Sequence, residues 1–231
     1  MSRIILANQS STPDDAGSGN GQLFVEGNKL FQQIGTDNAQ ELKTSTPKMS
    51  GFTSSGDFIA PADCTSVKIQ LWGGGGAGQY DGDDNPGAFC GGGGAHIVSI
   101  VTVTPGTSYT VTVGAGATSN PSDGGDTSVT INSVTYTAGG GGGDATWGSS
   151  SYNFGGTATN GNVLNLNGSG GTRLNNAGYG AGGNCPLGGA GMSTQYAYEG
   201  GDQSTRLRGG FPGGGGGGYA FGADGLALFS W

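Results

Sequence analysis

Four runs of consecutive glycines constrain the fold of this chain more than any other feature of its sequence. The runs are Gly73–Gly76, Gly91–Gly94, Gly139–Gly143 and Gly213–Gly218. With 54 glycines among 231 residues, the composition by itself is typical of a disordered, low-complexity chain. Each run, however, begins or ends at a segment able to bury apolar surface, such as VKIQLW before the first run. We therefore predict a folded β-protein in which the glycine runs are ordered.

Ordering a glycine run has an entropic cost of roughly 0.5–1 kcal/mol per residue relative to alanine. The run therefore needs a conformation whose interactions offset that cost. One such conformation is polyglycine II, a left-handed helix of the polyproline type with about 3 residues per turn. These helices lack side chains, so they can lie side by side, joined by backbone hydrogen bonds and weak Cα–H···O contacts. We predict polyglycine II helices at the runs that begin at Gly73, Gly91, Gly139 and Gly213. Flexible glycine loops are the alternative.

The remaining composition limits both the core and the partners. Only 33% of residues are hydrophobic and 10% are charged, which predicts a thin core. The formal net charge is −8, and the basic residues are scattered, with only Arg206 and Arg208 close together. Because nucleic acids and anionic membranes attract clustered Lys and Arg, we expect the chain to bind neither. The apolar run Ile4–Ala7 is too short for a secretion signal or a membrane span.

The chain divides into an N-terminal segment, residues 1–50, and a glycine-rich domain, residues 51–231. In the first segment, Gln22–Ile34 predicts a β-hairpin with its turn at Gly27–Asn28. A short hairpin is not stable by itself in water, so residues 1–50 are interpreted as an attachment segment with a linker. In the second segment, alternating stretches recur about every 8–12 residues, which is typical of an all-β sandwich.

Strand position predicts part of the core of this sandwich. Tight turns are expected at Pro105–Gly106 and Asn132–Ser133, between alternating stretches. No stretch has a convincing apolar period of 3.6 residues, so helices are expected to be few. The aromatic residues assigned to the core are Phe58, Trp72, Tyr109, Phe221, Phe229 and Trp231.

Residues 144–212 form an insertion that is rich in Gly, Asn, Ser and aromatic residues and poor in aliphatic ones. Loops on a rigid scaffold are a common place for binding. Aromatic rings supply large contact surfaces there, and Asn, Ser and Gly supply adaptable polar contacts. The alternative is that several of these rings fill the thin core. The candidate contact residues in this insertion and in the preceding loop are Tyr80, Phe89, Trp147, Tyr152, Phe154, Tyr179, Tyr196 and Tyr198.

The order of these motifs resembles the glycine-rich domain of bacteriophage tail-fibre and tail-tip proteins. The residues that carry the resemblance are FIAPADCTSVKIQLWGGGGAG, CGGGGAHIVSIVTVTPGTSYTVTVGAGA, GGDTSVTINSVTYTAGGGGG and GGGGGGYAFGADGLALFSW, in that order. The N-terminal LFVEGNKLFQQIG is similar to short hairpins of phage virion proteins. The chain differs from layered phage adhesins in being short and in having one aromatic-rich insertion in place of many equal loops.

This resemblance implies a function and a set of partners. It implies layered polyglycine helices whose connecting loops contact a bacterial receptor, either a glycan or an outer-membrane protein. It further implies a place on the outside of the virion, attachment to other virion proteins through residues 1–50, and a homo-oligomer, with a trimer favoured by analogy. The alternative function is a purely structural virion part, such as a collar, decoration or connector protein. An ice-binding or cell-wall glycine-rich protein fits the composition but not the hairpin.

Two segments partly match sequence motifs for binding a cofactor or a metal ion, and we interpret both as structural instead. The segment Gly73–Gly78 matches GxGxxG, but the residues that follow cannot begin the helix that a dinucleotide site needs. The acidic loop starts like a calcium-binding loop, but Pro86 and Gly92 replace the required Gly and Glu. A solvated loop is favoured over calcium there, and no cofactor is expected. The residues of this candidate calcium loop are Asp81, Asp83, Asp84 and Asn85.

The titratable residues likewise favour a protein that is not an enzyme. Three Gly-Gly-Asp segments, ending at Asp126, Asp144 and Asp202, are interpreted as turn caps in which the carboxylate binds backbone N–H groups. A Ser–His–Asp hydrolase would depend on His96, the single histidine, at the start of a strand.

The three cysteines, Cys64, Cys90 and Cys185, leave at least one without a disulfide partner inside the chain. Cys90 and Cys185 both lie beside glycine-rich stretches and are the candidates for one disulfide. Buried thiols are the favoured alternative.

Overall fold

The computed structural model divides the chain into two compact units, Met1–Pro47 and Lys48–Trp231. This boundary lies just before the one predicted after residue 50, because Met49–Phe52 forms a strand of the second unit. All elements of the described residues are β-strands, and none of these residues forms a helix that could span a membrane. The structure describes residues 8–9, 21–26, 29–34, 40–41, 48–80, 87–119, 121–143, 154–175, 180–191, 193–194, 208–218 and 220–231.

The first unit contains the predicted hairpin within a four-stranded sheet of order β1-β2-β3-β4. Strands β2 and β3 are antiparallel, with Glu26 opposite Lys29, and the predicted turn residues Gly27–Asn28 lie outside the described residues. Phe24 and Phe31 are directly opposite, and their rings stack with centroids 5.4 Å apart. The hairpin prediction is confirmed. The strands are β1 (Asn8–Gln9), β2 (Gly21–Glu26), β3 (Lys29–Ile34) and β4 (Gln40–Glu41).

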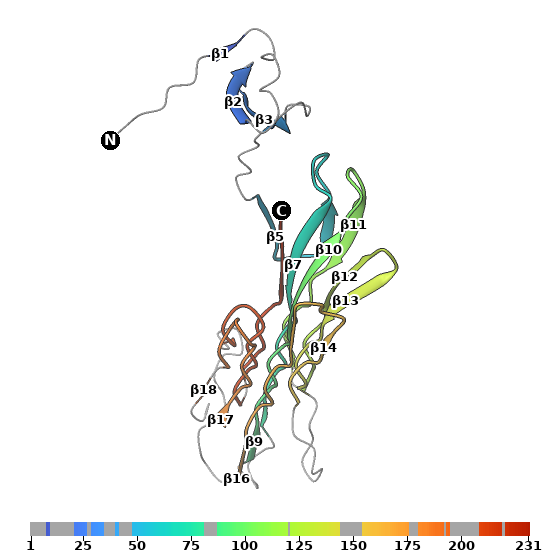
Figure 1. Cartoon of the computed structure of the whole chain (residues 1–231). Helices are drawn as coiled ribbons and strands as arrows, with labels where there is room; N and C mark the ends of the chain where they lie inside the picture. The colour runs from blue at the N-terminus through green and yellow to red at the C-terminus, as the bar shows by residue number, and fades with distance from the viewer. Residues whose placement is uncertain are drawn as a thin grey trace, which may run out of the picture. The chain divides into compact units, whose positions relative to one another are not determined.

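Two five-stranded antiparallel sheets make up one end of the second unit (Figure 1). The first sheet has the order β15-β10-β7-β19-β5, and the second has the order β14-β13-β12-β11-β6. The strands of the first sheet are β5 (Met49–Phe52), β7 (Ser66–Trp72), β10 (His96–Thr102), β15 (Leu164–Leu166) and β19 (Leu226–Ser230). Those of the second are β6 (Gly56–Ile59), β11 (Ser108–Thr112), β12 (Thr127–Ile131), β13 (Val134–Ala138) and β14 (Ala158–Thr159).

Both tight turns predicted between strands carry positive φ angles. Asn132 and Ser133 connect β12 to β13 with φ of 51° and 64°, and two positive φ values are what the favoured two-residue hairpin turn requires. Gly106 has φ of 76°, a backbone conformation that glycine adopts without steric penalty.

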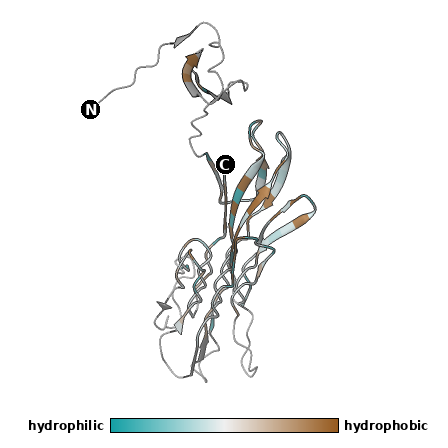
Figure 2. Cartoon of the chain, viewed as in Figure 1, coloured by the Kyte–Doolittle hydropathy of each residue, from teal (hydrophilic) through white to brown (hydrophobic). Residues whose placement is uncertain are grey.

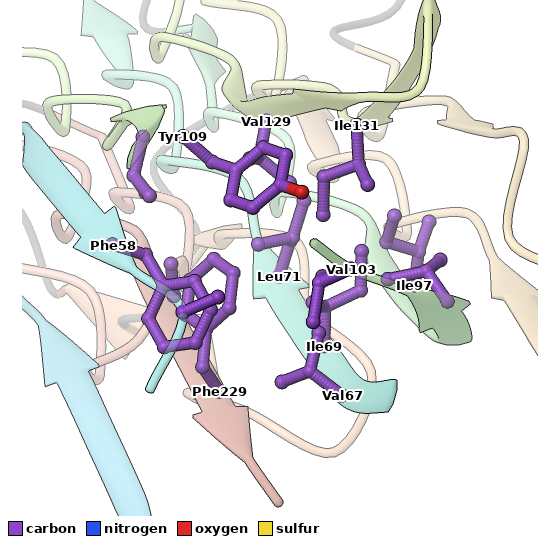
Figure 3. Close-up of a cluster of buried hydrophobic side chains, with 14 of the residues drawn as sticks. Phe58, Val67, Ile69, Leu71, Ile97, Val103, Tyr109, Val129, Ile131 and Phe229 are labelled. Carbon is purple, nitrogen blue, oxygen red and sulfur yellow. The ribbon is translucent and has the colours of Figure 1, made fainter. Parts of the chain in front are cut away.

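The hydrophobic core lies between the two sheets (Figure 3). Val67, Ile69 and Leu71 of β7 point into it, as their alternation in the sequence predicts. Phe58 of the second sheet stacks on Phe229 of the first, with ring centroids 4.4 Å apart. In the second unit, the strongly hydrophobic residues of Figure 2 concentrate in these strands. The other predicted core aromatics that the structure places in or against this cluster are Tyr109, which is buried, and Trp231, which is half-buried.

Beyond the sheets, the chain continues as extended segments that lie side by side without forming strands (Figure 1). Segment 73–78 follows β7, and its backbone N–H groups bind three neighbouring segments in turn. Residues three apart donate to the same neighbour, so the segment has a structural period of three. The donors and acceptors are Gly73 and Gly76 to Ala95 and Gly92, Gly74 and Ala77 to Gly125 and Ser122, and Gly75 and Gly78 to Ala223 and Ala220, all at 2.8–3.0 Å.

Segment 73–78 is enclosed on all sides. Its carbonyls accept hydrogen bonds from three further segments, through the N–H groups of Gly141, Ala117 and Gly216. Segment 90–95 shows the same period of three, with Cys90 and Gly93 both donating to segment 169–172. The six neighbours of segment 73–78 are 91–95, 122–125 and 220–223, which accept its N–H groups, and 114–117, 139–143 and 213–217, which donate to its carbonyls.

These segments approach one another too closely for side chains. A Cβ atom on Gly75 would lie 2.1 Å from the carbonyl oxygen of Gly214, and one on Gly91 would lie 2.1 Å from that of Gly76. The described glycine runs are therefore hydrogen-bonded segments whose packing requires glycine. We call the whole assembly the glycine array; its segments are 73–78, 90–95, 114–117, 122–126, 139–143, 154–157, 167–172, 181–185, 188–191, 208–217 and 220–225.

Candidate functional site

The segments of the glycine array run from the five-stranded sheets to an opposite end, which we call the distal end. Two small sheets mark the distal end, one of order β16-β9-β8 and one made of β17 and β18 (Figure 1). Their strands are β8 (Gln79–Tyr80), β9 (Gly87–Phe89), β16 (Arg173–Asn175), β17 (Gly180–Ala181) and β18 (Ser193–Thr194).

Three stretches of the chain begin and end at the distal end, and a fourth begins there; together they contain most of the predicted contact residues. The first three join Tyr80 to Gly87, Gly143 to Phe154, and Asn175 to Gly180, whereas the fourth runs from Thr194 to Arg208, which lies beside Phe221 partway along the glycine array. The stretches are 81–86, 144–153, 176–179 and 195–207, all outside the described residues. Five predicted contact residues fall in them and therefore also lie outside the described residues: Trp147, Tyr152, Tyr179, Tyr196 and Tyr198.

The other three predicted contact residues have different positions. Phe154 is 70% exposed at the distal end, where its carbonyl accepts the N–H of Gly142 at 2.8 Å. Tyr80 lies in β8, with its backbone opposite Ala88 of β9. Phe89 is only 2% exposed, so the prediction that Phe89 contacts a receptor is wrong. Its strand is central in the order β16-β9-β8, and the ring is enclosed beneath the surface.

The acidic residues that the structure describes serve the backbone of the array. Asp126 accepts the N–H of Gly140 at 2.8 Å, and Asp123 accepts the N–H of Gly143 at 2.6 Å. Two carboxylates three residues apart thus bind two N–H groups three residues apart. Asp126 has a structural role, as predicted, but its carboxylate binds an N–H group 14 residues away on another segment instead of capping a local turn. The contribution of Asp123 was missed, although its spacing in DGGD (residues 123–126) follows the period of three.

No group of three or more His, Cys, Asp or Glu side chains among the described residues could hold a metal ion. The candidate calcium residues Asp81, Asp83, Asp84 and Asn85 lie outside the described residues, as do Asp144 and Asp202 of the other two Gly-Gly-Asp segments.

Cys90 and Cys185 do not form the predicted disulfide; both are buried thiols. The Cys185 thiol donates to the carbonyl of Ala95 at 3.7 Å, whereas the Cys90 sulfur accepts the Thr172 hydroxyl at 3.9 Å. The backbone of Cys185 lies beside Gly93, three residues after Cys90 on one extended segment, which at about 3.1 Å per residue separates the two cysteine backbones by roughly 9 Å. That separation exceeds the reach of a disulfide. Burial raises the pKa of Cys185 to about 12, so this thiol is uncharged at neutral pH.

His96 and Trp72 form a buried aromatic pair where the first sheet meets the glycine array. The residues are directly opposite in β10 and β7, and their rings stack with centroids 4.4 Å apart. His96 is fully buried, and neither of its ring nitrogens nor Trp72 Nε1 has a hydrogen-bond partner among the described residues. Burial, with a smaller effect of the positive charge on Lys68, lowers the pKa of His96 to about 4. His96 is therefore a neutral, enclosed ring with no described serine or aspartate bound to it.

The fold and the array agree with the result of the sequence comparisons. The sequence profile of the family described as "Glycine-rich domain" matches residues 53–227, most of the chain. The chain therefore belongs to the glycine-rich domain family. Among curated proteins, none matches it in sequence.

Proposed function

We propose that this chain is a component of a bacteriophage tail fibre or tail tip that contributes to recognition of a bacterial surface receptor. The motif order that resembles phage tail proteins motivates the proposal. The arrangement of the chain supports it, because each of the aromatic-rich stretches leaves the glycine array at its distal end, away from the five-stranded sheets. We further propose that the protein acts without catalysis or a cofactor, and that residues 1–50 attach it to other virion proteins on the outside of the particle.

In this proposal, the segments of the glycine array are polyglycine II helices. Two observations support the assignment. Residues three apart bind the same neighbour, which matches about 3 residues per turn, and segment 73–78 has six hydrogen-bonded neighbours, as side-by-side threefold helices would. Such an array has almost no side chains to rearrange, so it provides a rigid base for the stretches that it joins.

The observation that carries the functional proposal is the convergence at the distal end. Phe154 is exposed there, the stretches that contain Trp147, Tyr152 and Tyr179 begin and end there, and the stretch that contains Tyr196 and Tyr198 begins there. Aromatic residues supply most of the binding energy in many interfaces, and Asn, Ser and Gly around them supply adaptable polar contacts. We propose that these aromatic residues contact a glycan or an outer-membrane protein of the host.

The proposal is tested by the binding of the fluorescently labelled full chain to a panel of bacterial strains. We expect saturable binding to some strains, and we expect Phe154→Ala to weaken it, with a further loss in Trp147→Ala/Tyr198→Ala. Phe211→Ala is the matched control. Phe211 is also exposed, at 55%, but it lies after segment 208–210, nearer to the five-stranded sheets than to the distal end. Unfolding curves must be unchanged in all variants for the comparison to count.

Two results would contradict the proposal. Equal loss of binding in Phe154→Ala and Phe211→Ala would place the contact away from the distal end. A folded chain that binds no strain but binds purified virion proteins would identify a purely structural virion component.

A further inference from the structure

Phe154, which is exposed at the distal end, has its backbone and its side chain in very different surroundings. The residue as a whole is 70% exposed. Its carbonyl oxygen nevertheless accepts the N–H of Gly142 at 2.8 Å, and a Cβ atom on Gly92 would lie only 2.0 Å from the same oxygen. The backbone of Phe154 is therefore packed tightly between two glycine segments, while the residue presents most of its surface to solvent.

Two hydrogen bonds, three residues apart, join the segment that contains Phe154 to segment 139–143. Gly139 donates to the carbonyl of Thr157 at 2.9 Å, and Gly142 donates to that of Phe154. The bond from Gly142 is the one at the distal end, because the chain leaves the array one residue later. The position of Phe154 therefore depends on how firmly the last residues of segment 139–143 are held.

The carboxylate of Asp123 holds those last residues. Its Oδ1 atom accepts the N–H of Gly143 at 2.6 Å, and a Cβ atom on Gly142 would lie 3.8 Å from the same oxygen. The backbone of Asp123 is itself fixed, since both of its chain neighbours are hydrogen-bonded to other segments of the array. A carboxylate on an anchored backbone thus provides the last described hydrogen bond of this segment before the chain leaves the array.

Asp126 makes the same kind of bond at a place where less depends on it. Its carboxylate accepts the N–H of Gly140 at 2.8 Å. Gly140 is flanked by Gly139 and Gly141, whose N–H groups both bind carbonyls of other segments at 2.9 Å. These flanking bonds keep the segment in place if the bond to Asp126 is lost, whereas Gly143 is the last described residue of its segment.

We propose that Asp123 is a positioning residue for recognition, which holds Phe154 where it meets the receptor without touching the receptor itself. This inference rests on the proposed function. Without the Asp123 carboxylate, the N–H of Gly143 loses its acceptor, and glycine has no Cβ to restrict the rotation that follows. The bond from Gly142 to Phe154 is the next to open, and the exposed ring then has to be ordered again when it binds.

Fluorine NMR of the full chain, with trifluoromethyl-phenylalanine incorporated at position 154, reports on this ring without any receptor. We expect Asp123→Ala to shift and sharpen the fluorine resonance, because the ring averages over more positions. Asp123→Asn should keep the wild-type resonance, since its amide oxygen still accepts an N–H. Asp126→Ala is the matched control, which removes an equivalent bond and should also leave the resonance unchanged. Urea unfolding of each variant verifies that the fold is retained.

Binding to a bacterial strain that the wild-type chain recognises measures the consequence for recognition. We expect Asp123→Ala to weaken the affinity by roughly two- to tenfold, which corresponds to the cost of ordering one freed side chain on binding. Asp123→Asn and Asp126→Ala should bind as the wild-type chain does. A loss shared by Asp123→Ala and Asp126→Ala would reflect general weakening of the array and would count against a positioning role.

An unchanged fluorine resonance in Asp123→Ala would overturn the proposal. So would a changed resonance without any loss of binding, because recognition would then not need Phe154 to be held in place. A wild-type chain that binds no strain would remove the recognition role together with the functional proposal. The fluorine spectra distinguish these two failures, because they show whether Asp123 holds Phe154 when no receptor is present.

Discussion

At the scale of single residues, the His96–Trp72 pair shows how the chain joins two kinds of packing. The pair occupies the last outward row of the first sheet before the glycine array begins, and its rings fill a place where glycine segments and strands meet. The three buried ring nitrogens lack described partners, so this junction stabilises the fold by packing rather than by hydrogen bonds.

The low pKa of His96 makes stability depend on pH. In the unfolded chain the imidazole titrates near pH 6.5, whereas in the folded chain its pKa is about 4. The unfolded state therefore binds more protons between pH 6.5 and 4, and stability that is fully present above pH 6.5 is lost as the pH falls through this window. At 1.36 kcal/mol per pKa unit, the loss attributable to His96 is on the order of 3 kcal/mol.

The measurement is the free energy of urea unfolding of the wild-type chain and of His96→Phe at pH 7, 6, 5 and 4. We expect the difference between the two proteins to change in favour of His96→Phe as the pH falls, because phenylalanine keeps the stacked ring without a titrating group. Carboxylates titrate equally in both proteins and cancel in the comparison. Parallel pH profiles would mean that His96 remains able to bind a proton in the folded chain.

At the scale of elements, the glycine array replaces side-chain packing with backbone contacts. Each buried N–H of segment 73–78 has a carbonyl partner on another segment, so the array satisfies its polar groups as a sheet does, but in three directions. Asp123 and Asp126 extend this pattern to a segment edge by binding two N–H groups of segment 139–143. A substitution in an interior segment therefore perturbs two segments at once.

Gly75→Ala tests that dependence. The added Cβ would lie 2.1 Å from the Gly214 carbonyl oxygen, so segments 73–78 and 213–217 would have to separate and weaken their hydrogen bonds. We expect the free energy of unfolding to fall by about 3 kcal/mol. Gly56→Ala is the matched control, because its Cβ would meet only the Phe52 ring at 3.6 Å, an ordinary contact. Equal effects of the two substitutions in urea unfolding would contradict the close approach.

At the scale of the whole molecule, local patterns in the sequence predicted the strands and the ordering of the glycine runs. Alternation assigns Val67, Ile69 and Leu71 to the core without knowledge of any distant contact. The enclosure of segment 73–78 could not be predicted, because its partners, such as Ala223, are far away in the chain and glycine runs carry no side-chain signal of pairing. Burial of Phe89 was missed for a different reason, because β9 is too short to show a pattern of alternation.

The interior of the glycine array should exchange its amide hydrogens as slowly as the strands of the sandwich. Each N–H of Gly74, Gly75 and Gly76 binds a different segment, so no local opening frees one of them without disturbing its neighbours. We expect hydrogen-exchange protection at residues 74–76 to match that of Ile69–Leu71. The exposed residues 53–55, between β5 and β6, supply a fast-exchanging reference within the same chain. Exchange of residues 74–76 at the rate of residues 53–55 would show that the glycine runs are loops, and the rigid base required by the functional proposal would be lost with them.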